Sequence, residues 1–306
     1  MLVSVVIPCY NVEQYIEECI QSVISQTYKS IEIICIDNNS TDNTYQTLIQ
    51  LKEKYSHLII DKELKEGACA ARNKGLLLSI GEWIQFLDAD DLLLPNKIEH
   101  QVELVRSSSK NIAFIAAAFK RRSLQGIDSE IIVLNSIKSI APFINQCGNT
   151  CSNFWNKKAL IEIGAWNEKL KSSQETDLML RLVLSNNDFT LDLKPFTIIR
   201  ERISGQISQR NPKEKWCQYV DVRIRYLNEL KQRYFESYNQ NKKSFYKFLL
   251  ISLSILATYD INSALKRYNS YVKKEVDVFD LKFAFIKLFG FNLYLKLKFI
   301  LKNIKD

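Results

Sequence analysis

Three aspartates, Asp88, Asp90 and Asp91, stand within four residues of one another in the segment 86–91. They follow the apolar segment 81–87, which is typical of a buried strand. Carboxylates this close repel one another, and burying them is costly unless a cation lies among them. Mg²⁺ and Mn²⁺ prefer oxygen ligands and commonly bind one or two carboxylates together with substrate phosphates. The cluster therefore predicts a metal–diphosphate site.

A simpler function for the same residues is helix capping. Asp90 or Asp91 could cap a helix that begins near Pro95, because a carboxylate there accepts hydrogen bonds from backbone N–H groups. One aspartate is enough for a cap, and three in four residues exceed that need. The metal site is the interpretation we favour.

The elements around this cluster alternate regularly along the chain. Apolar, β-branched runs at 2–7, 31–36, 58–61 and 82–87 predict strands, and segments with helical spacing lie between them. Such alternation predicts an α/β fold with a mainly parallel sheet and helices on both faces. Ligands bind beyond the carboxyl ends of the strands in these sheets. Polar residues at 10–11, 37–38 and 88–91 follow three of the strands, so we expect them to converge on one crevice.

The order of several short motifs resembles that of family 2 glycosyltransferases. The motifs are Pro-Cys-Tyr-Asn at 8–11, the segment 22–28, Asp-Asn-Asn-Ser-Thr-Asp at 37–42, Ala-Arg-Asn at 71–73 and the aspartate segment 86–91. The similarity resumes at 163–168 and 174–182. It implies a GT-A fold followed by a helical C-terminal extension, a nucleotide-sugar donor, a divalent metal, and transfer with inversion of configuration.

The resemblance also implies roles for the acidic cluster. Asp90 would bind the metal, either Mn²⁺ or Mg²⁺, with Asp91 in support, and Asp88 would share in the metal site or face the ribose or sugar. Arg72 would reach the diphosphate or the sugar. A metal neutralises the charge that develops on a departing nucleoside diphosphate, so the chemistry agrees with the motif.

The nucleotide pocket implied by the resemblance contains Pro8, Tyr10, Asn11, Asp37 and Asn38. Tyr10 could stack on the base. The family commonly has a second aspartate at the last of these positions, where it accepts a hydrogen bond from the uracil ring. The amide oxygen of Asn38 can accept too, but the amide also donates. A UDP-sugar is the first expectation, and guanine and thymine nucleotides stay open.

A second acidic constellation, Gln174-Glu175-Thr176-Asp177, opens a segment with helical spacing. Acids at a helix N-terminus also interact favourably with the helix dipole. The family has a Glu-Asp pair here, and its aspartate is the general base. By this resemblance Glu175 takes the position of the base and Asp177 is the reserve. A carboxylate can deprotonate the acceptor hydroxyl.

Three further observations concern residues 101–212. Arg202 stands where family members often have a histidine, and an arginine can pair with phosphate although it cannot bind a metal. The aromatic residues Phe154, Trp155 and Trp166 could stack on a sugar, or they could pack in the core. Cys147 and Cys151 are spaced like a metal pair, but no second Cys/His pair accompanies them, which argues against a zinc site.

The net charge of +8 is unevenly distributed. Residues 231–306 contain 15 Lys and Arg against 6 Asp and Glu, and a basic amphipathic helix is predicted from about residue 279 to 304 with Lys287, Lys298, Lys302 and Lys305 on one side. This helix could bind an anionic membrane surface or pack on the catalytic domain. The charge has no nucleic-acid-binding motif beside it, so nucleic acid is not expected as a partner.

The scattered, odd-numbered cysteines and the absence of a signal peptide favour the cytoplasm, with a peripheral place on the inner face of the cell membrane left open.

These observations predict three regions: a donor half at 1–100, an acceptor half at 101–212 and a basic helical region at 213–306. The predicted activity is non-processive transfer of one sugar to a glycan or a lipid-linked acceptor. A nucleotidyltransferase would need a Gly- and Lys-rich loop after the first strand, and segment 8–11 is not one. The alternative that stays open is a catalytically inactive nucleotide-sugar-binding subunit that recruits partners through its basic tail.

Overall fold

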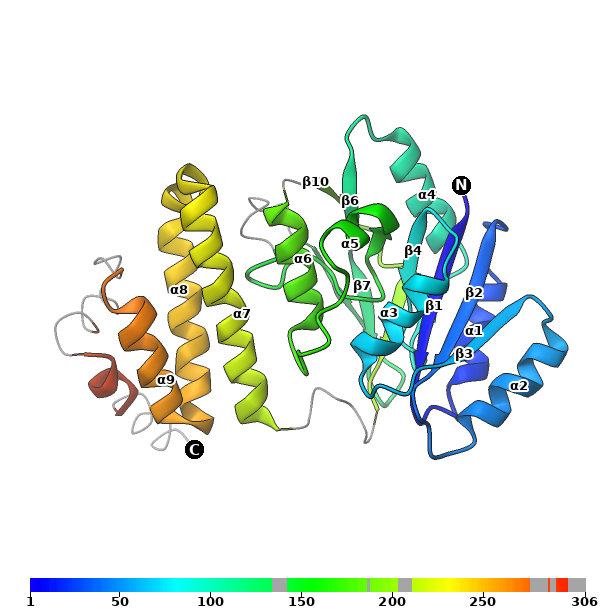
Figure 1. Cartoon of the computed structure of the whole chain (residues 1–306), viewed down its shortest axis with the longest axis horizontal. Coiled ribbons are helices and arrows are strands. Elements are labelled where there is room, and N and C mark those ends of the chain that lie inside the picture. Colours follow the sequence, from blue (N-terminus) through cyan, green and yellow to red (C-terminus); the bar gives the residue numbers. More distant parts are fainter. Residues whose placement is uncertain (134–141, 186–187, 203–210, 276–285, 287–289, 297–306) are drawn as a thin grey trace. The chain divides into compact units, whose positions relative to one another are not determined.

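The structure is a computed structural model that describes residues 1–133, 142–185, 188–202, 211–275, 286 and 290–296. Two compact units divide the chain, Met1–Gly205 and Gln206–Asp306. The first unit contains both acidic constellations, and the second is helical (Figure 1).

A seven-stranded sheet forms the centre of the first unit, with the strand order β10-β6-β9-β4-β1-β2-β3. Six of the strands pair in parallel within two groups, and β9 is antiparallel to both of its neighbours, β4 and β6. The strands are β1 (Val3–Cys9), β2 (Ile31–Asp37), β3 (Leu58–Lys62), β4 (Trp83–Phe86), β6 (Ile112–Ala117), β9 (Phe154–Asn156) and β10 (Asp188–Asp192). The predicted strands at the N-terminus and their parallel pairing are therefore confirmed.

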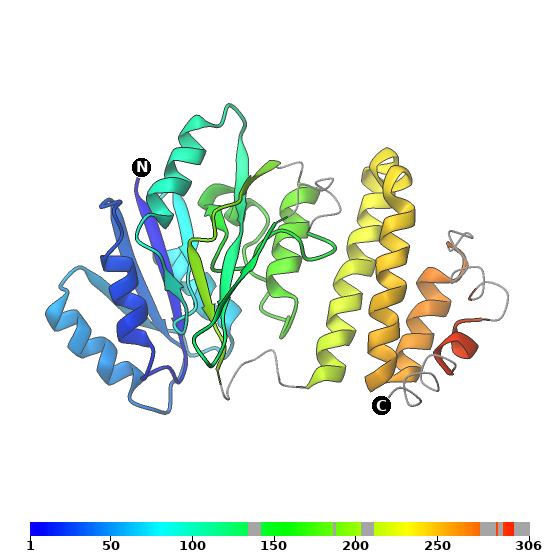
Figure 2. The same cartoon turned by 180° about the vertical axis from the view of Figure 1, so that it is seen from behind.

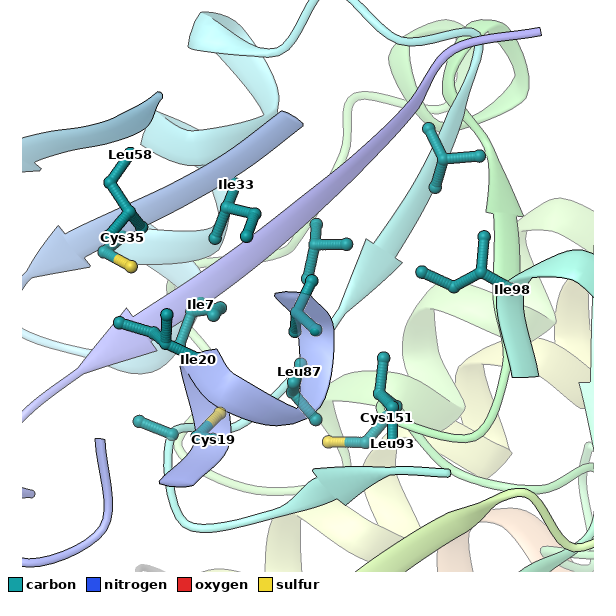
Figure 3. Packing of buried hydrophobic residues seen from close by; sticks show 14 of the residues in the cluster. Ile7, Cys19, Ile20, Ile33, Cys35, Leu58, Leu87, Leu93, Ile98 and Cys151 are labelled. Atoms are coloured by element: carbon teal, nitrogen blue, oxygen red, sulfur yellow. The ribbon is translucent and has the colours of Figure 1, made fainter. Parts of the chain in front are cut away.

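Helices cover both faces of this sheet. Figure 1 shows α3 (Ala68–Leu78), α5 (Lys157–Glu162) and α6 (Gln174–Leu184) in front of it, and Figure 2 shows α1 (Ile16–Ile24), α2 (Thr44–Lys54) and α4 (Lys97–Ser107) on the other side. Alternate residues of β1 point to opposite faces, so Val5 and Ile7 join the cluster under α1, and Val6 joins the cluster under α3. Figure 3 shows Ile7, Ile20 and Leu87 in the first of these clusters.

Gly75 allows α3 to lie close against β1. A Cβ atom at this position would be only 2.3 Å from Cγ1 of Val6, which is closer than real side chains approach. The helix therefore packs directly on the strand, and its N-terminal half, with Arg72, reaches the carboxyl end of the sheet.

A second, four-stranded sheet has the order β5-β11-β7-β8. Its strands are β5 (Leu92–Leu93), β7 (Phe119–Arg122), β8 (Asp128–Ile131) and β11 (Thr197–Arg200). Because β5 directly follows the acidic cluster and pairs with β11, residues near 200 are brought beside the aspartates. This pairing joins parts of the chain that are more than 100 residues apart.

The second unit contains α7 (Pro212–Arg233), α8 (Phe235–Tyr259), α9 (Ile261–Arg267) and a π-helical turn, Tyr268–Val272. Leu227, Phe245 and Leu249 are among its buried residues. Among the described residues, none of the helices is both long enough and apolar enough to cross a membrane. The basic amphipathic helix predicted for 279–304 lies largely outside the described residues, as do Lys287, Lys298, Lys302 and Lys305.

Candidate active site

The three aspartates of the cluster follow β4 and have different partners. Oδ1 of Asp88 lies 2.6 Å from Nη2 of Arg72, and Oδ2 of Asp90 lies 3.3 Å from Nη1 of Arg202. Asp91 is buried, and its Oδ1 accepts a hydrogen bond from the backbone N–H of Arg200 at 2.9 Å. Helix α4 begins at Lys97 with Asn96 as its N-cap, so neither Asp90 nor Asp91 caps it.

Two of the three carboxyl groups have raised pKa values. Burial raises the pKa of the Asp90 carboxyl, and the charge of Asp88 raises it further. Burial also raises the pKa of Asp91 well above its usual range, with added repulsion from Asp90 and Asp88. A divalent cation would relieve this repulsion, so the oxygen-rich donor set fits Mg²⁺ or Mn²⁺.

Cys151, which the sequence offered only as a possible metal pair with Cys147, lies beside the aspartates. Its sulfur accepts a hydrogen bond from the N–H of Asp88 at 3.2 Å, and one ligand atom from each of Asp88, Asp91 and Cys151 lies within 4.8 Å of the others. Gln85 holds the Cys151 carbonyl at 2.7 Å. Burial raises the pKa of this thiol well above its usual range, and the charges of Asp88 and Asp91 add to the effect. The thiol of Cys151 thus lies directly against the aspartates.

Arg72 links the two acidic constellations. Its side chain is 5% exposed, and its guanidinium reaches Asp88 on one side and Oε1 of Gln174, at 3.3 Å, on the other. It also lies 4.8 Å above the ring of Trp166. Gln174 is the first residue of α6, so one buried arginine joins the end of β4 to the start of the helix that contains Glu175.

The two candidate bases lie in different environments on α6. Glu175 is partly exposed, and its negative charge, after the larger effect of burial, helps to raise the pKa of Cys69 on α3 to about 11. Asp177 is fully buried, and its Oδ2 lies 2.8 Å from Nε of Arg181. Two further N–H groups of Arg181 donate to the carbonyls of Ile163 and Ala165. Asp177 therefore belongs to an internal ion pair, and Glu175 is the accessible carboxylate.

The loop after β1 supplies the predicted aromatic surface. Tyr10 is 47% exposed, and Pro8 is partly buried in the strand before it. Asn11 has a positive φ of 51°, and its Oδ1 accepts a hydrogen bond from the N–H of Thr41 at 2.8 Å. This contact connects the loop after β1 with the loop after β2, so the polar ends of the two strands converge as predicted.

Asp37 and Asn38, at the end of β2, have separate functions. The amide nitrogen of Asn38 donates to the carbonyls of Glu63 and Lys65, and its oxygen accepts from the N–H of Gly67 at 2.7 Å. Its side chain therefore holds the segment before α3. Oδ1 of Asp37 is buried and has no hydrogen-bond partner among the described residues. Such atoms are rare in folded proteins, so this oxygen is the better acceptor for a ligand N–H group.

Arg202 and Arg200 bring two further positive charges, besides that of Arg72, close to the aspartates. Arg202 donates to Asp90 and, from Nη2, to the carbonyl of Asn11 at 3.2 Å. Arg200 was not predicted, and its guanidinium donates to the Asp90 carbonyl and pairs with Glu18. Only the pairing of β11 with β5 places it here, so the sequence held no local signal for it.

The aromatic residues named for the acceptor side lie in the core. Phe154 and Trp155 are fully buried, and Trp166 is 2% exposed. Trp155 stacks on Phe114 at a centroid distance of 5.3 Å, and Trp166 meets Phe86 edge-on at 5.2 Å. Of the two alternatives that the sequence left open for these residues, core packing is therefore the one that the structure supports.

The comparison with known families agrees with the motifs. The sequence profile of glycosyl transferase family 2 matches residues 4–164, which is more than half of the chain. The chain therefore belongs to glycosyl transferase family 2. The matched range ends before α6, so it covers the acidic cluster but not Glu175.

Two curated relatives show how far the sequence similarity extends. An uncharacterized glycosyltransferase of Rickettsia conorii is 33% identical over 189 residues, 59% of this chain and 31% of the relative. The UDP-Glc:alpha-D-GlcNAc-diphosphoundecaprenol beta-1,3-glucosyltransferase WfgD of Escherichia coli is 34% identical over 159 residues, 49% of this chain and 58% of the relative. The chain thus spans between about a third and three fifths of the length of these relatives.

Solved structures share the fold at low sequence identity. Residues 1–349 of Staphylococcus aureus TarS, in complex with UDP-GlcNAc, superpose with a TM-score of 0.67 and 16% identity, covering 99% of this chain and 92% of that one. The mannosyltransferase PcManGT of Pyrobaculum calidifontis, in complex with GDP-Man and Mn²⁺, has a TM-score of 0.57 and 13% identity, covering 96% and 84%. The predicted GT-A fold with C-terminal helices is confirmed.

Proposed function

We propose that this protein moves one sugar, with inversion, from a nucleotide-sugar donor to a hydroxyl group of a glycan or a lipid-linked acceptor. The observation that carries the proposal is the bridge made by Arg72, which contacts both Asp88 and Gln174. Glycosyl transfer needs a group that stabilises the leaving diphosphate and a base for the acceptor, close together. The bridge brings the carboxylates after β4 next to the helix that contains Glu175.

A UDP-sugar is the donor that we propose first. The relative WfgD is named as a UDP-Glc-dependent enzyme, and TarS was solved with UDP-GlcNAc. Tyr10 offers an exposed ring to the base, and Asp37 offers a carboxylate oxygen to a ring N–H. PcManGT was solved with GDP-Man, so a guanine nucleotide belongs in any test.

Mn²⁺ or Mg²⁺ is the proposed cofactor. Asp90 would hold it, with Asp88 and Asp91 completing the acidic site, and the mutual repulsion of these carboxylates supports the assignment. When bound, the ion would supply neutralisation of the charge on the leaving nucleoside diphosphate. Arg202 would donate to the same phosphates, because its Nε is buried and has no partner among the described residues.

The transfer itself would be a single displacement. The acceptor oxygen would attack the anomeric carbon while the bond from that carbon to the phosphate oxygen breaks, and Glu175 would take the acceptor proton. The electron pair of the broken bond stays with the nucleoside diphosphate. Attack opposite to the leaving group inverts the configuration at the anomeric carbon.

The acceptor and the location that we propose are taken from the name of the relative WfgD. WfgD is named for a diphosphoundecaprenol-linked acceptor, which favours a lipid-linked acceptor at the inner face of the cell membrane here too. In this proposal residues 1–100 bind the donor, residues 101–212 face the acceptor, and residues 213–306 form the basic helical region.

The test is turnover of UDP-, GDP- and dTDP-sugars with Mn²⁺ by the wild type, Glu175→Gln and the exposed control Glu162→Gln. We expect slow hydrolysis of one donor by the wild type and the control. In Glu175→Gln this rate should fall by about 100- to 10,000-fold while donor binding is retained. A donor that binds but is not turned over, even with lipid-linked acceptors, would instead identify an inactive binding subunit.

A further inference from the structure

Arg202 is the cation that holds Asp90 in this structure. Its guanidinium contacts Asp90 Oδ2 at 3.3 Å and the Asn11 carbonyl at 3.2 Å, and it lies 4.9 Å above the ring of Tyr15. Asp90 follows β4, whereas Asn11 and Tyr15 lie between β1 and α1. One side chain therefore connects the acidic cluster with the loop that we assign to the nucleotide.

An arginine and a metal ion compete for the negative charge of one carboxylate. A guanidinium has no lone pair to offer a metal, so it opposes metal binding instead of joining the coordination. Asp90 is the aspartate whose position in the motif assigns it to the metal. Arg202 thus already compensates, through Oδ2, the carboxylate charge that would attract a divalent cation.

The two arginine–aspartate pairs differ in how readily they could open. Arg72 lies 2.6 Å from Asp88, its side chain is 6% exposed, and it contacts both Gln174 and the ring of Trp166. The Arg202 contact with Asp90 is longer, and the Arg202 side chain is 16% exposed. Nε is without a partner among the described residues in both arginines, so the longer contact and the greater exposure of Arg202 are what distinguish the two pairs. Arg202 is therefore the arginine that a ligand can draw away more readily.

We propose that Arg202 is an internal counter-cation that occupies Asp90 until the diphosphate of the donor draws it away, which couples donor binding to metal binding. This inference rests on the proposed function. Phosphate oxygens are strong, bidentate partners for a guanidinium. Moving Arg202 from Asp90 to the diphosphate frees the carboxylate for the metal, and the coupling is reciprocal by linkage.

The decisive variant is Arg202→Gln, with Arg106→Gln as the matched control. Arg106 is an exposed residue of α4, so its replacement removes one positive charge without touching the site. Mn²⁺ affinity without nucleotide can be measured from the electron paramagnetic resonance signal of free Mn²⁺. UDP and uridine affinities in EDTA can be measured by calorimetry, and thermal unfolding reports whether each variant is folded.

The proposal predicts effects of opposite sign on the two ligands. Arg202→Gln should bind Mn²⁺ alone about 5- to 10-fold more tightly than the wild type, a coupling of ordinary size. It should bind UDP in EDTA more weakly, and it should bind uridine unchanged, because uridine has no phosphate. Arg106→Gln should match the wild type for all three ligands.

Two outcomes would overturn the proposal, and they are distinguishable. If Arg202→Gln and the wild type bind Mn²⁺ equally without nucleotide, Arg202 does not compete for Asp90, and the metal assignment is unaffected. If neither protein binds Mn²⁺ even with UDP present, the metal assignment in the proposed function is itself wrong, and the counter-cation role falls with it.

Discussion

The carboxylates after β4 and the carboxylates at the start of α6 are the same kind of group in two environments. After β4, burial and the repulsion from Asp88 raise the pKa of Asp90, which shares its oxygen with a partly exposed arginine. In α6, Asp177 is fully buried and is paired with Arg181 within the same helix. The carboxylates after β4 carry charge that a cation could neutralise, whereas the carboxylate of Asp177 already forms an internal ion pair with Arg181.

The difference shows that residue type does not decide function at these positions. An aspartate in an acidic motif can be a ligand, a base or a structural anchor, depending on which partners surround it. In α6 the anchor is Asp177, and the base that we propose is the nearby Glu175, which is partly exposed. Three substitutions test this contrast between carboxylates that are available to a ligand and a carboxylate that is held in an ion pair.

Asp90→Asn should have the largest effect, because it removes the charge that a metal needs. We expect Mn²⁺ affinity in the presence of UDP to fall by more than about 100-fold, since loss of even a supporting residue of a metal site commonly costs 10- to 100-fold. The control is Asp61→Asn on β3, whose carboxylate pairs with Lys74. Equal Mn²⁺ binding by Asp90→Asn and the wild type would remove Asp90 from the metal site.

Asp177→Asn should act on stability. The Arg181 side chain is 25% exposed, so the charge that is left behind is partly solvated, and we expect a loss of about 1 to 3 kcal/mol in the free energy of unfolding. Urea unfolding should show this loss for Asp177→Asn and leave Glu175→Gln close to the wild type. If Asp177→Asn kept its stability and lost turnover, Asp177 would be the base and the contrast between the two environments would be broken.

Asn38→Asp should have the smallest effect. It asks whether the amide of Asn38, like the carboxylate of Asp177, holds the fold and does not bind a ligand. The substitution removes the two N–H donors to the carbonyls of Glu63 and Lys65, so we expect a loss of about 1 to 2 kcal/mol of unfolding free energy. UDP affinity, measured by calorimetry, should not increase. Tighter UDP binding with unchanged stability would show that the side chain at position 38 contacts the nucleotide base.

Most of the donor half could be predicted from the sequence. The strands β1 to β4 are continuous apolar runs, and the intervening helices have clear 3.6-residue spacing, so local pattern was sufficient. The polar residues at the strand ends could be placed at one edge because parallel strands end on the same side. Residue order and spacing were therefore enough to place Tyr10, Asp37 and Asp88 at one edge of the sheet.

The aromatic residues of the acceptor half show where local pattern was insufficient. Trp155 and Trp166 are amphipathic side chains that suit either a sugar site or a core, and the choice depends on what covers them. Their burial against Phe114 and Phe86 requires strands and helices from three parts of the chain. No window of sequence around either tryptophan contains that information.

The sequence by itself determined the family, the fold class and the acidic motifs, because these depend on residue types at short spacing. Only the tertiary structure decided which groups pair with those acids. Arg200 and Arg202 reach the aspartates through the pairing of β5 with β11, and Cys151 reaches them from a loop some 60 residues downstream. The electrostatic state of a carboxylate depends on neighbours in space, and contacts so distant along the chain exist only once the chain has folded.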